Sequence, residues 1–232
     1  MARSEHLVLL PGLLCDAALW QHQIEGLGDR CQIMVGDLTR GGSIADIAEE
    51  ILDEAPTRFA LAGLSMGGYV AQEIRRQAPD RVERLALVDT KARADTVKQR
   101  KTRESLIRLA DVGKFKGVTP KLLPNLIHPS RMDDPGVAGV VMEMAERVGQ
   151  EAFKRQQTAI LGRKDGRADL YAVRVPTLIL AGREDLLCPP ETQEEMAAHI
   201  PNARLELLDV CGHLAPLERP AETNKIFDEW LG

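Results

Sequence analysis

The feature that most constrains the fold is a serine flanked by glycines at the end of an apolar run. Residues 59–62 are apolar, the pattern Gly-x-Ser-x-Gly centred on Ser65 follows directly, and residues 69–78 then show a helical pattern. A serine on so sharp a strand-to-helix turn needs a strained backbone, which Gly63 and Gly67 permit because they lack Cβ atoms. The pattern predicts that Ser65 presents its hydroxyl to a substrate carbonyl as a nucleophile.

Short apolar runs alternate with helical patterns along the chain, which is typical of parallel βαβ units. The expected strands are residues 6–10, 32–35, 58–62, 82–88, 177–181 and 204–208. The expected helices between them are residues 18–27, 44–54, 66–78, 191–199 and 221–231. The sequence therefore predicts an α/β fold whose sheet is mostly parallel and has about six strands.

A serine nucleophile needs a base that accepts its proton, and the base needs a carboxylate that fixes its tautomer. Of the five histidines, only His213 lies in a loop after a predicted strand, at the sheet edge where ligands bind in open α/β folds. Asp185 and Asp89 each follow a predicted strand, so both qualify as the acid. The helix that begins after Ser65 directs the backbone N–H of Met66 toward a developing oxyanion.

Four further segments extend this pattern: Leu9-Leu10-Pro11-Gly12-Leu13, Gly182-Arg-Glu-Asp185, Cys211-Gly-His213 and Glu218-Arg-Pro220. Together with the serine turn, they resemble the α/β-hydrolase family over nearly the whole chain, in particular its small, capped, esterase-like members. The resemblance implies a mostly parallel sheet with helices on both faces, no cofactor, and hydrolysis through an acyl-enzyme.

The resemblance also assigns roles to single residues. Relatives mostly place the acid at the position of Asp185, so we take Asp185 as the acid and Asp89 as the alternative. Alignment with the family places the second oxyanion donor at the backbone N–H of Leu13. Pro11 replaces the histidine that relatives commonly have, a departure that concerns loop anchoring more than catalysis. Because the chain begins almost at its first predicted strand, we expect the N-terminal strands of many relatives to be truncated here.

The alternation of strands and helices breaks between residues 93 and 173, where helical segments are punctuated by prolines and glycines. So long a detour between two strands is not an ordinary loop. We expect a helical cap over residues 93–173 and a hydrolase core formed by residues 1–92 and 174–232. Such a cap supplies a wall of the substrate pocket. Because aromatic residues make up 3% of the chain, this wall should be mostly aliphatic, and the candidates are Leu126, Val141, Met144 and Phe153.

Composition excludes several classes of protein. The net charge is −5 without a sustained basic stripe, which argues against a nucleic-acid partner. No apolar run reaches the length of a membrane span, and the first one is too short for a signal peptide, so we expect a cytoplasmic protein without a membrane partner. The four cysteines lack paired ligand spacing, which predicts free thiols and no metal site. Nothing in the sequence indicates the oligomeric state.

The residues favour a serine hydrolase that cleaves a small carboxylic ester, with a thioester or a lactone as variants. A serine at the turn argues against dehalogenases and epoxide hydrolases of this family, whose nucleophile is an aspartate. Two alternatives stay open: a C–C bond hydrolase with the same triad, and a ligand receptor with the hydrolase fold. The basic run of Lys98, Arg100, Lys101 and Arg103 is interpreted as a solvated helix face rather than a site for anionic substrates.

Overall fold

Six parallel strands form one sheet in the computed structural model, which describes residues 6–232. Their order across the sheet is β2-β1-β3-β4-β5-β6. The strands are β1 (His6–Leu10), β2 (Gln32–Val35), β3 (Phe59–Leu64), β4 (Val82–Val88), β5 (Thr177–Gly182) and β6 (Arg204–Leu208). The predicted parallel sheet of six strands is confirmed. β3 runs two residues further than expected, because Gly63 and Leu64 still pair with the end of β4.

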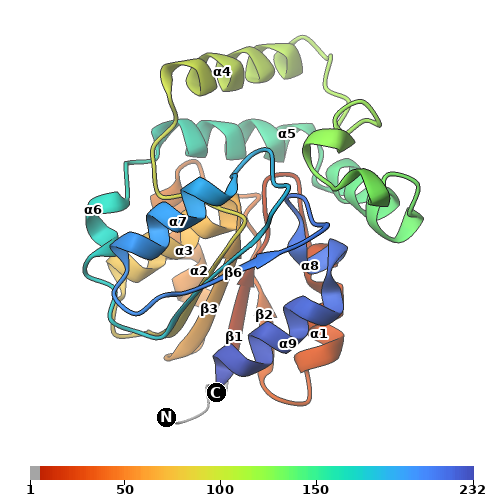
Figure 1. Ribbon diagram of the computed structural model, residues 1–232. Helices are drawn as coiled ribbons and strands as arrows, with labels where there is room; N and C mark the ends of the chain where they lie inside the picture. Colours follow the sequence, from red (N-terminus) through yellow and green to blue (C-terminus); the bar gives the residue numbers. More distant parts are fainter. Residues whose placement is uncertain (1–5) are drawn as a thin grey trace.

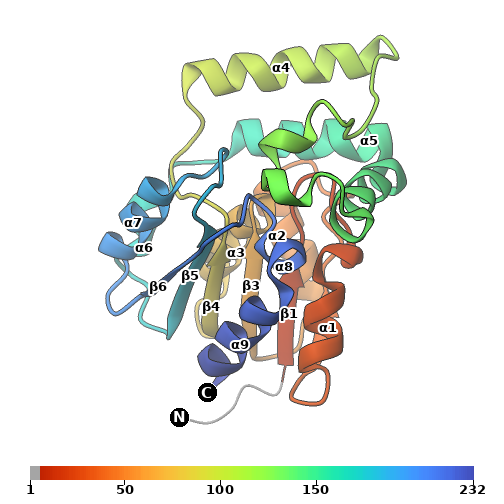
Figure 2. The same cartoon turned by 45° about the vertical axis from the view of Figure 1, so that its right-hand side comes forward.

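Helices cover both faces of this sheet (Figures 1 and 2). One apolar layer joins the sheet to α1 (Gln21–Leu27) and α9 (Pro220–Leu231). The other joins it to α2 (Ile44–Glu54), α3 (Met66–Gln77) and α7 (Pro190–His199). The central strands β3 and β5 are buried at every residue, as expected where helices lie on both faces, whereas the edge strands β2 and β6 are partly exposed.

Two short helices were not anticipated in this form. The start of the expected helix 18–27 is a separate 3-10 helix (Ala17–Trp20), because the Asp16 side chain accepts a hydrogen bond from Ala18 N and caps it. The four-residue helix α8 (Ala215–Glu218) follows His213 directly and precedes α9. Among residues 6–232, no helix combines the length and the apolar character that a membrane crossing requires.

Between β4 and β5 the chain forms a series of helices, most of which lie above the carboxyl-terminal edge of the sheet, whereas the last one lies beside α7 (Figures 1 and 2). They are α4 (Val97–Asp111), the 3-10 turns Leu123–Asn125 and Pro129–Arg131, the π-helix Pro135–Gly139, α5 (Val140–Gly162) and α6 (Arg167–Leu170). α5 is far longer than the short helices expected, and its backbone kinks at Gly149, where φ is +76°. The division into a core and a cap at residues 93 and 173 stays a prediction.

Candidate functional site

Ser65 lies on a strained turn between β3 and α3. Its φ of 52° and ψ of −111° are unusual for a residue with a side chain, a conformation that costs about 1–3 kcal/mol. The two glycines make the turn possible: a Cβ on Gly63 would lie 2.2 Å from Gly67 O, and a Cβ on Gly67 would lie 2.2 Å from Leu10 O. The Thr90 hydroxyl donates a 2.7 Å hydrogen bond to Ser65 O and holds the turn from the next strand.

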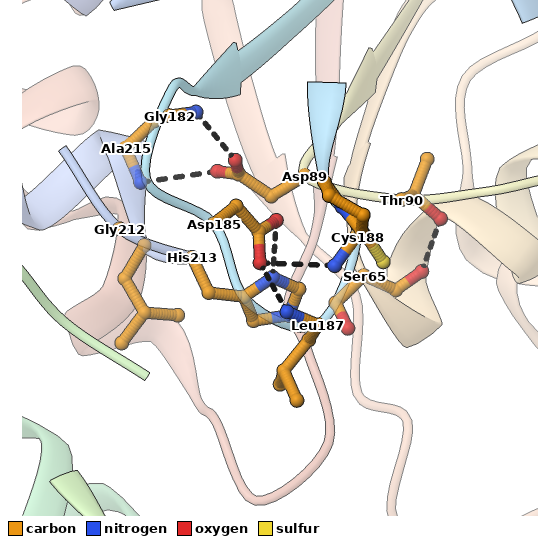
Figure 3. Close-up of polar contacts among 12 residues, drawn as sticks. Ser65, Asp89, Thr90, Gly182, Asp185, Leu187, Cys188, Gly212, His213 and Ala215 are labelled. Carbon is orange, nitrogen blue, oxygen red and sulfur yellow. Dashed lines mark hydrogen bonds and ion pairs between the residues drawn. The ribbon is translucent and has the colours of Figure 1, made fainter. Parts of the chain in front are cut away.

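His213 and Asp185 form a hydrogen-bonded pair beside this turn (Figure 3). Asp185 follows β5, His213 follows β6, and Asp185 Oδ2 lies 2.7 Å from His213 Nδ1. The other carboxylate oxygen, Oδ1, accepts the backbone N–H groups of Leu187 at 2.8 Å and Cys188 at 3.0 Å. Because Asp185 engages Nδ1, the imidazole keeps Nε2 free as an acceptor.

Opposing influences set the charge states of this pair. Burial lowers the pKa of His213, but the Asp185 carboxylate and, more weakly, those of Asp89 and Glu218 together raise it above the ordinary value. Burial raises the pKa of Asp185, but His213 and the N–H groups of the loop lower it further, so that its pKa is depressed. Asp185 is therefore an ionised carboxylate that stabilises the histidinium formed when His213 accepts a proton.

A raised histidine pKa has a consequence for the pH dependence of catalysis. The base must be neutral to accept a proton, so we expect kcat/KM for an uncharged ester to fall as pH decreases through the His213 pKa. The midpoint of this acid limb should lie above the ordinary histidine value of about 6.5. A pH profile of kcat/KM measures it, and a midpoint at or below that value would contradict the assignment.

Asp89 is also buried at the end of a strand, but its hydrogen bonds go to residues other than His213. Its Oδ1 accepts Gly182 N at 2.9 Å and its Oδ2 accepts Ala215 N at 3.1 Å (Figure 3). Burial and the charge of Asp185 raise the pKa of Asp89 well above its usual range. Asp89 thus joins the ends of β4 and β5 to the start of α8, and of the two candidate acids only Asp185 lies against the histidine.

Glu218 was not singled out from the sequence as a site residue, yet its carboxylate organises the histidine loop. It is fully buried and accepts the backbone N–H of Gly212 at 3.0 Å and of Leu214 at 3.1 Å, the two neighbours of His213. It also accepts His128 N at 2.7 Å. The only signal in the sequence was its place in the Glu-Arg-Pro segment, because no local pattern states that a side chain folds back onto the preceding loop.

We expect Glu218→Gln to lower kcat by about tenfold to a hundredfold. An amide NH₂ would oppose one of these backbone N–H groups and displace His213, and displacements of about 1 Å are costly in catalysis. The measurement is kcat together with the melting temperature. Glu222→Gln, which alters an exposed carboxylate on the adjoining helix, is the matched control. A folded Glu218→Gln variant with unchanged kcat would contradict the positioning role.

The two predicted oxyanion donors belong to segments close to Ser65: Met66 follows it in the chain, and Leu13 lines the same cavity. Met66 is the first residue of α3, and Leu13 lies in the loop after β1. In this loop Leu14 has a φ of 59°, and its backbone N–H donates to Gln156 Oε1 at 3.1 Å. Gln156 on α5, which the sequence reasoning missed, thus anchors the loop despite the departure at Pro11.

A cavity of about 540 Å³ opens above the serine and is lined by Ser65, His213 and Leu13. Of the four pocket candidates, Leu126 and Val141 also line it. Met144 is fully buried in the apolar core, and Phe153 packs on Phe115 at 5.0 Å between ring centroids, so neither reaches the cavity. The expectation of a mostly aliphatic wall stays a prediction. Leu106, Val118 and Ile160 add aliphatic lining, but polar and charged residues at the start of and along α4 line the cavity too: Thr96, Lys98, Gln99, Thr102 and Arg103.

Within the described chain, ligand atoms of Asp185, Cys188 and His213 lie within 4.8 Å of one another. These atoms are poorly suited to a metal. Asp185 already uses both oxygens in hydrogen bonds, one of them to His213 Nδ1. Burial strongly raises the pKa of the Cys188 thiol, and a metal needs the thiolate. The arrangement is a hydrogen-bonded acid–base pair.

Comparison with known proteins places this geometry in a family. The model of the alpha/beta hydrolase family matches residues 7–226. The chain is 30% identical to the pimeloyl-[acyl-carrier protein] methyl ester esterase of Nitrosomonas europaea, with 96% of this chain and 94% of that protein covered. It is 29% identical to the putative carbamate hydrolase RutD of Azorhizobium caulinodans, with 97% and 89% covered. A thermophilic esterase from Thermogutta terrifontis superposes with a TM-score of 0.88 at 27% identity, covering 100% and 90%. The chain belongs to the α/β-hydrolase family and is a hydrolase.

Proposed function

We propose that this chain hydrolyses a small carboxylic ester through an acyl-enzyme, with Ser65 as the nucleophile, His213 as the general base and Asp185 as the acid. The observation that carries the proposal is the 2.7 Å hydrogen bond between Asp185 and His213 beside a cavity that Ser65 and His213 both line. The similarity to an esterase over nearly the full length of both proteins supports ester hydrolysis as the class of reaction.

In the first half of the reaction, Ser65 Oγ attacks the ester carbonyl carbon while His213 Nε2 takes the hydroxyl proton. The backbone N–H groups of Met66 and Leu13 stabilise the oxyanion of the tetrahedral intermediate. Asp185 stabilises the histidinium, which then protonates the departing alkoxide as the ester C–O bond breaks. Water repeats the sequence on the acyl-enzyme: His213 takes a proton from the water, and Ser65 leaves with that proton as the carboxylic acid is released.

In this proposal, residues 93–173 act as a cap that sets the length of the acyl chain. A cavity of about 540 Å³ suits a small ligand, so we expect kcat/KM across p-nitrophenyl esters from acetate to palmitate to peak at short or medium chains. Leu126→Ala and Val141→Ala, which enlarge the lining, should move the peak toward longer chains. Leu122→Ala changes an exposed leucine of the same segment and is the control. A peak at palmitate, or a profile that neither lining variant moves, would refute the proposed role of the cap.

A further inference from the structure

Three cationic side chains line the catalytic cavity. Lys91, Lys98 and Arg103 line it together with Ser65, and among residues 6–232 those that line it include no aspartate or glutamate. Lys98 and Arg103 come from the basic run of α4. The interpretation of that run as a solvated face fails for Arg103, whose side chain is 18% exposed, whereas Lys98 is exposed at the rim of the cavity. The interpretation holds for Lys101, which is exposed and lies outside the cavity.

Lys91 is unusual among these cations. It lies two residues after Asp89, just past the end of β4, and it is only 8% exposed. Within the described part of the chain, it forms no salt bridge with a carboxylate. Burial lowers the pKa of Lys91, and the nearby Arg163 and Arg103 lower it further, whereas Asp95 raises it.

Lys91, Arg103 and Arg163 form a cationic cluster around one carboxylate, that of Asp95. The single negative charge of Asp95 does not neutralise this cluster. The Asp95 side chain is 1% exposed and pairs with Arg103 Nε at 2.5 Å and with Arg163 Nη2 at 2.9 Å. Lys91 adds a third cation near the same carboxylate. The three cations therefore exceed Asp95 by two positive charges. The cluster also holds Arg163 Nε buried without a hydrogen-bond partner, next to the Tyr69 ring that lines the cavity.

A surplus of positive charge in a partly buried site is costly, and an anion bound beside it offsets that cost. In a cavity with low-dielectric walls, charge of one sign also concentrates ligands of the opposite sign. We propose that Lys91, with Arg103 and Lys98, binds a carboxylate of the substrate, so that the preferred esters are small and carry a carboxylate on the acyl or the alcohol part. This inference rests on the proposed ester hydrolysis and adds the charge of its substrate.

Pairs of esters that differ only in charge test this proposal. One arm uses monomethyl esters of succinic, glutaric, adipic and pimelic acids, which carry the carboxylate on the acyl part. The other arm uses O-acetyl esters of short hydroxy acids, which carry it on the alcohol part. Each ester is paired with the analogue in which the carboxylate is a carboxamide, and kcat/KM is obtained from pH-stat rates. We expect the carboxylate ester to exceed its amide partner by about tenfold or more in at least one arm.

Substitution of the lysine then separates charge recognition from a structural role. In Lys91→Met the ratio of kcat/KM for carboxylate to amide should fall toward one, whereas Lys91→Arg should retain most of it. Damage to the fold alone would lower both members of a pair and leave their ratio unchanged. Lys101→Met, which removes an exposed lysine outside the cavity, is the control and should keep the wild-type ratio. Lys98→Met offers a second variant at the rim if Lys91→Met does not fold.

Ratios near one in both arms for the wild type would overturn the proposal, and so would a wild-type preference that survives both lysine substitutions. Either result would leave the proposed ester hydrolysis intact, because hydrolysis of p-nitrophenyl acetate does not depend on a substrate carboxylate. Loss of ester hydrolysis altogether is a different result. A wild-type protein that is inactive on p-nitrophenyl acetate and on every ester pair would refute the proposed function itself.

Discussion

Ser65→Ala should lose about 10³- to 10⁶-fold in kcat on p-nitrophenyl acetate while it folds like the wild type. The alanine removes the only atom that forms the acyl-enzyme and leaves the turn between β3 and α3 intact. A small stability gain or loss is expected, because the strained φ of 52° at this position is retained by either residue. Single-turnover kinetics and the melting temperature measure the two effects separately.

Covalent labelling gives an independent test of the nucleophile. A fluorophosphonate probe should modify the wild type at Ser65, and peptide mapping identifies the labelled residue. Ser105→Ala, at an exposed serine of α4, is the matched control and should label like the wild type. A label on another residue, or equal labelling of Ser65→Ala, would show that the turn does not carry the nucleophile.

The sheet could be predicted from the sequence because each strand is a short apolar run bounded by a helix or a turn. Four of the six strands, including β1 and β4, have the bounds that the pattern predicted. The helical insertion was much less predictable. Short 3-10 turns, a π-helix and a 23-residue helix kinked at Gly149 share a segment in which prolines and glycines obscure the periodicity.

From the sequence, only those site residues could be predicted that directly follow a recognisable strand. Ser65, Asp185 and His213 each follow a strand, so their meeting at one sheet edge follows from the parallel order. Glu218 and Gln156 were missed for different reasons: Glu218 folds back onto the loop that precedes it, which no local pattern indicates, and Gln156 accepts the N–H of Leu14, which is distant in sequence. Such side chain to backbone contacts depend on tertiary packing that no local periodicity encodes.

The charge of the cavity was missed for a related reason. The basic run of α4 has the composition of a solvated helix, and only the way α4 lies over the sheet brings Arg103 to the same cavity as Lys91. The exposed face of a helix can be predicted from the periodicity of its own residues. The net charge of a pocket depends on which helices and strands surround that pocket in the folded protein. Asp95 could not be placed from the sequence either: its side chain is 1% exposed and pairs with Arg103 and Arg163, which lie far from it along the chain or in another helix.

Asp185→Asn should lose about 10⁴-fold in kcat, whereas Asp89→Asn should lose far less. The hydrogen bonds of Asp185 explain why the loss is large. Its Oδ1 accepts two backbone N–H groups, so an asparagine keeps its carbonyl oxygen there and turns its NH₂ toward His213 Nδ1. The imidazole then accepts at Nδ1 and carries its proton on Nε2, which leaves it unable to take the proton of Ser65.

Asp89→Asn acts on a different part of the structure. Both of its oxygens accept backbone N–H groups, from Gly182 and from Ala215. An asparagine keeps one acceptor oxygen, and its NH₂, a donor, faces the other N–H. One buried N–H is left unsatisfied, so the variant should lose about 1–3 kcal/mol of stability and retain the His213 tautomer. Measurement of kcat and of the free energy of unfolding for both variants separates the two effects. The carboxylate that orients His213 is the one whose removal changes the tautomer of His213. If Asp89→Asn shows the larger loss in kcat at a temperature where it is fully folded, the roles of the two aspartates must therefore be exchanged.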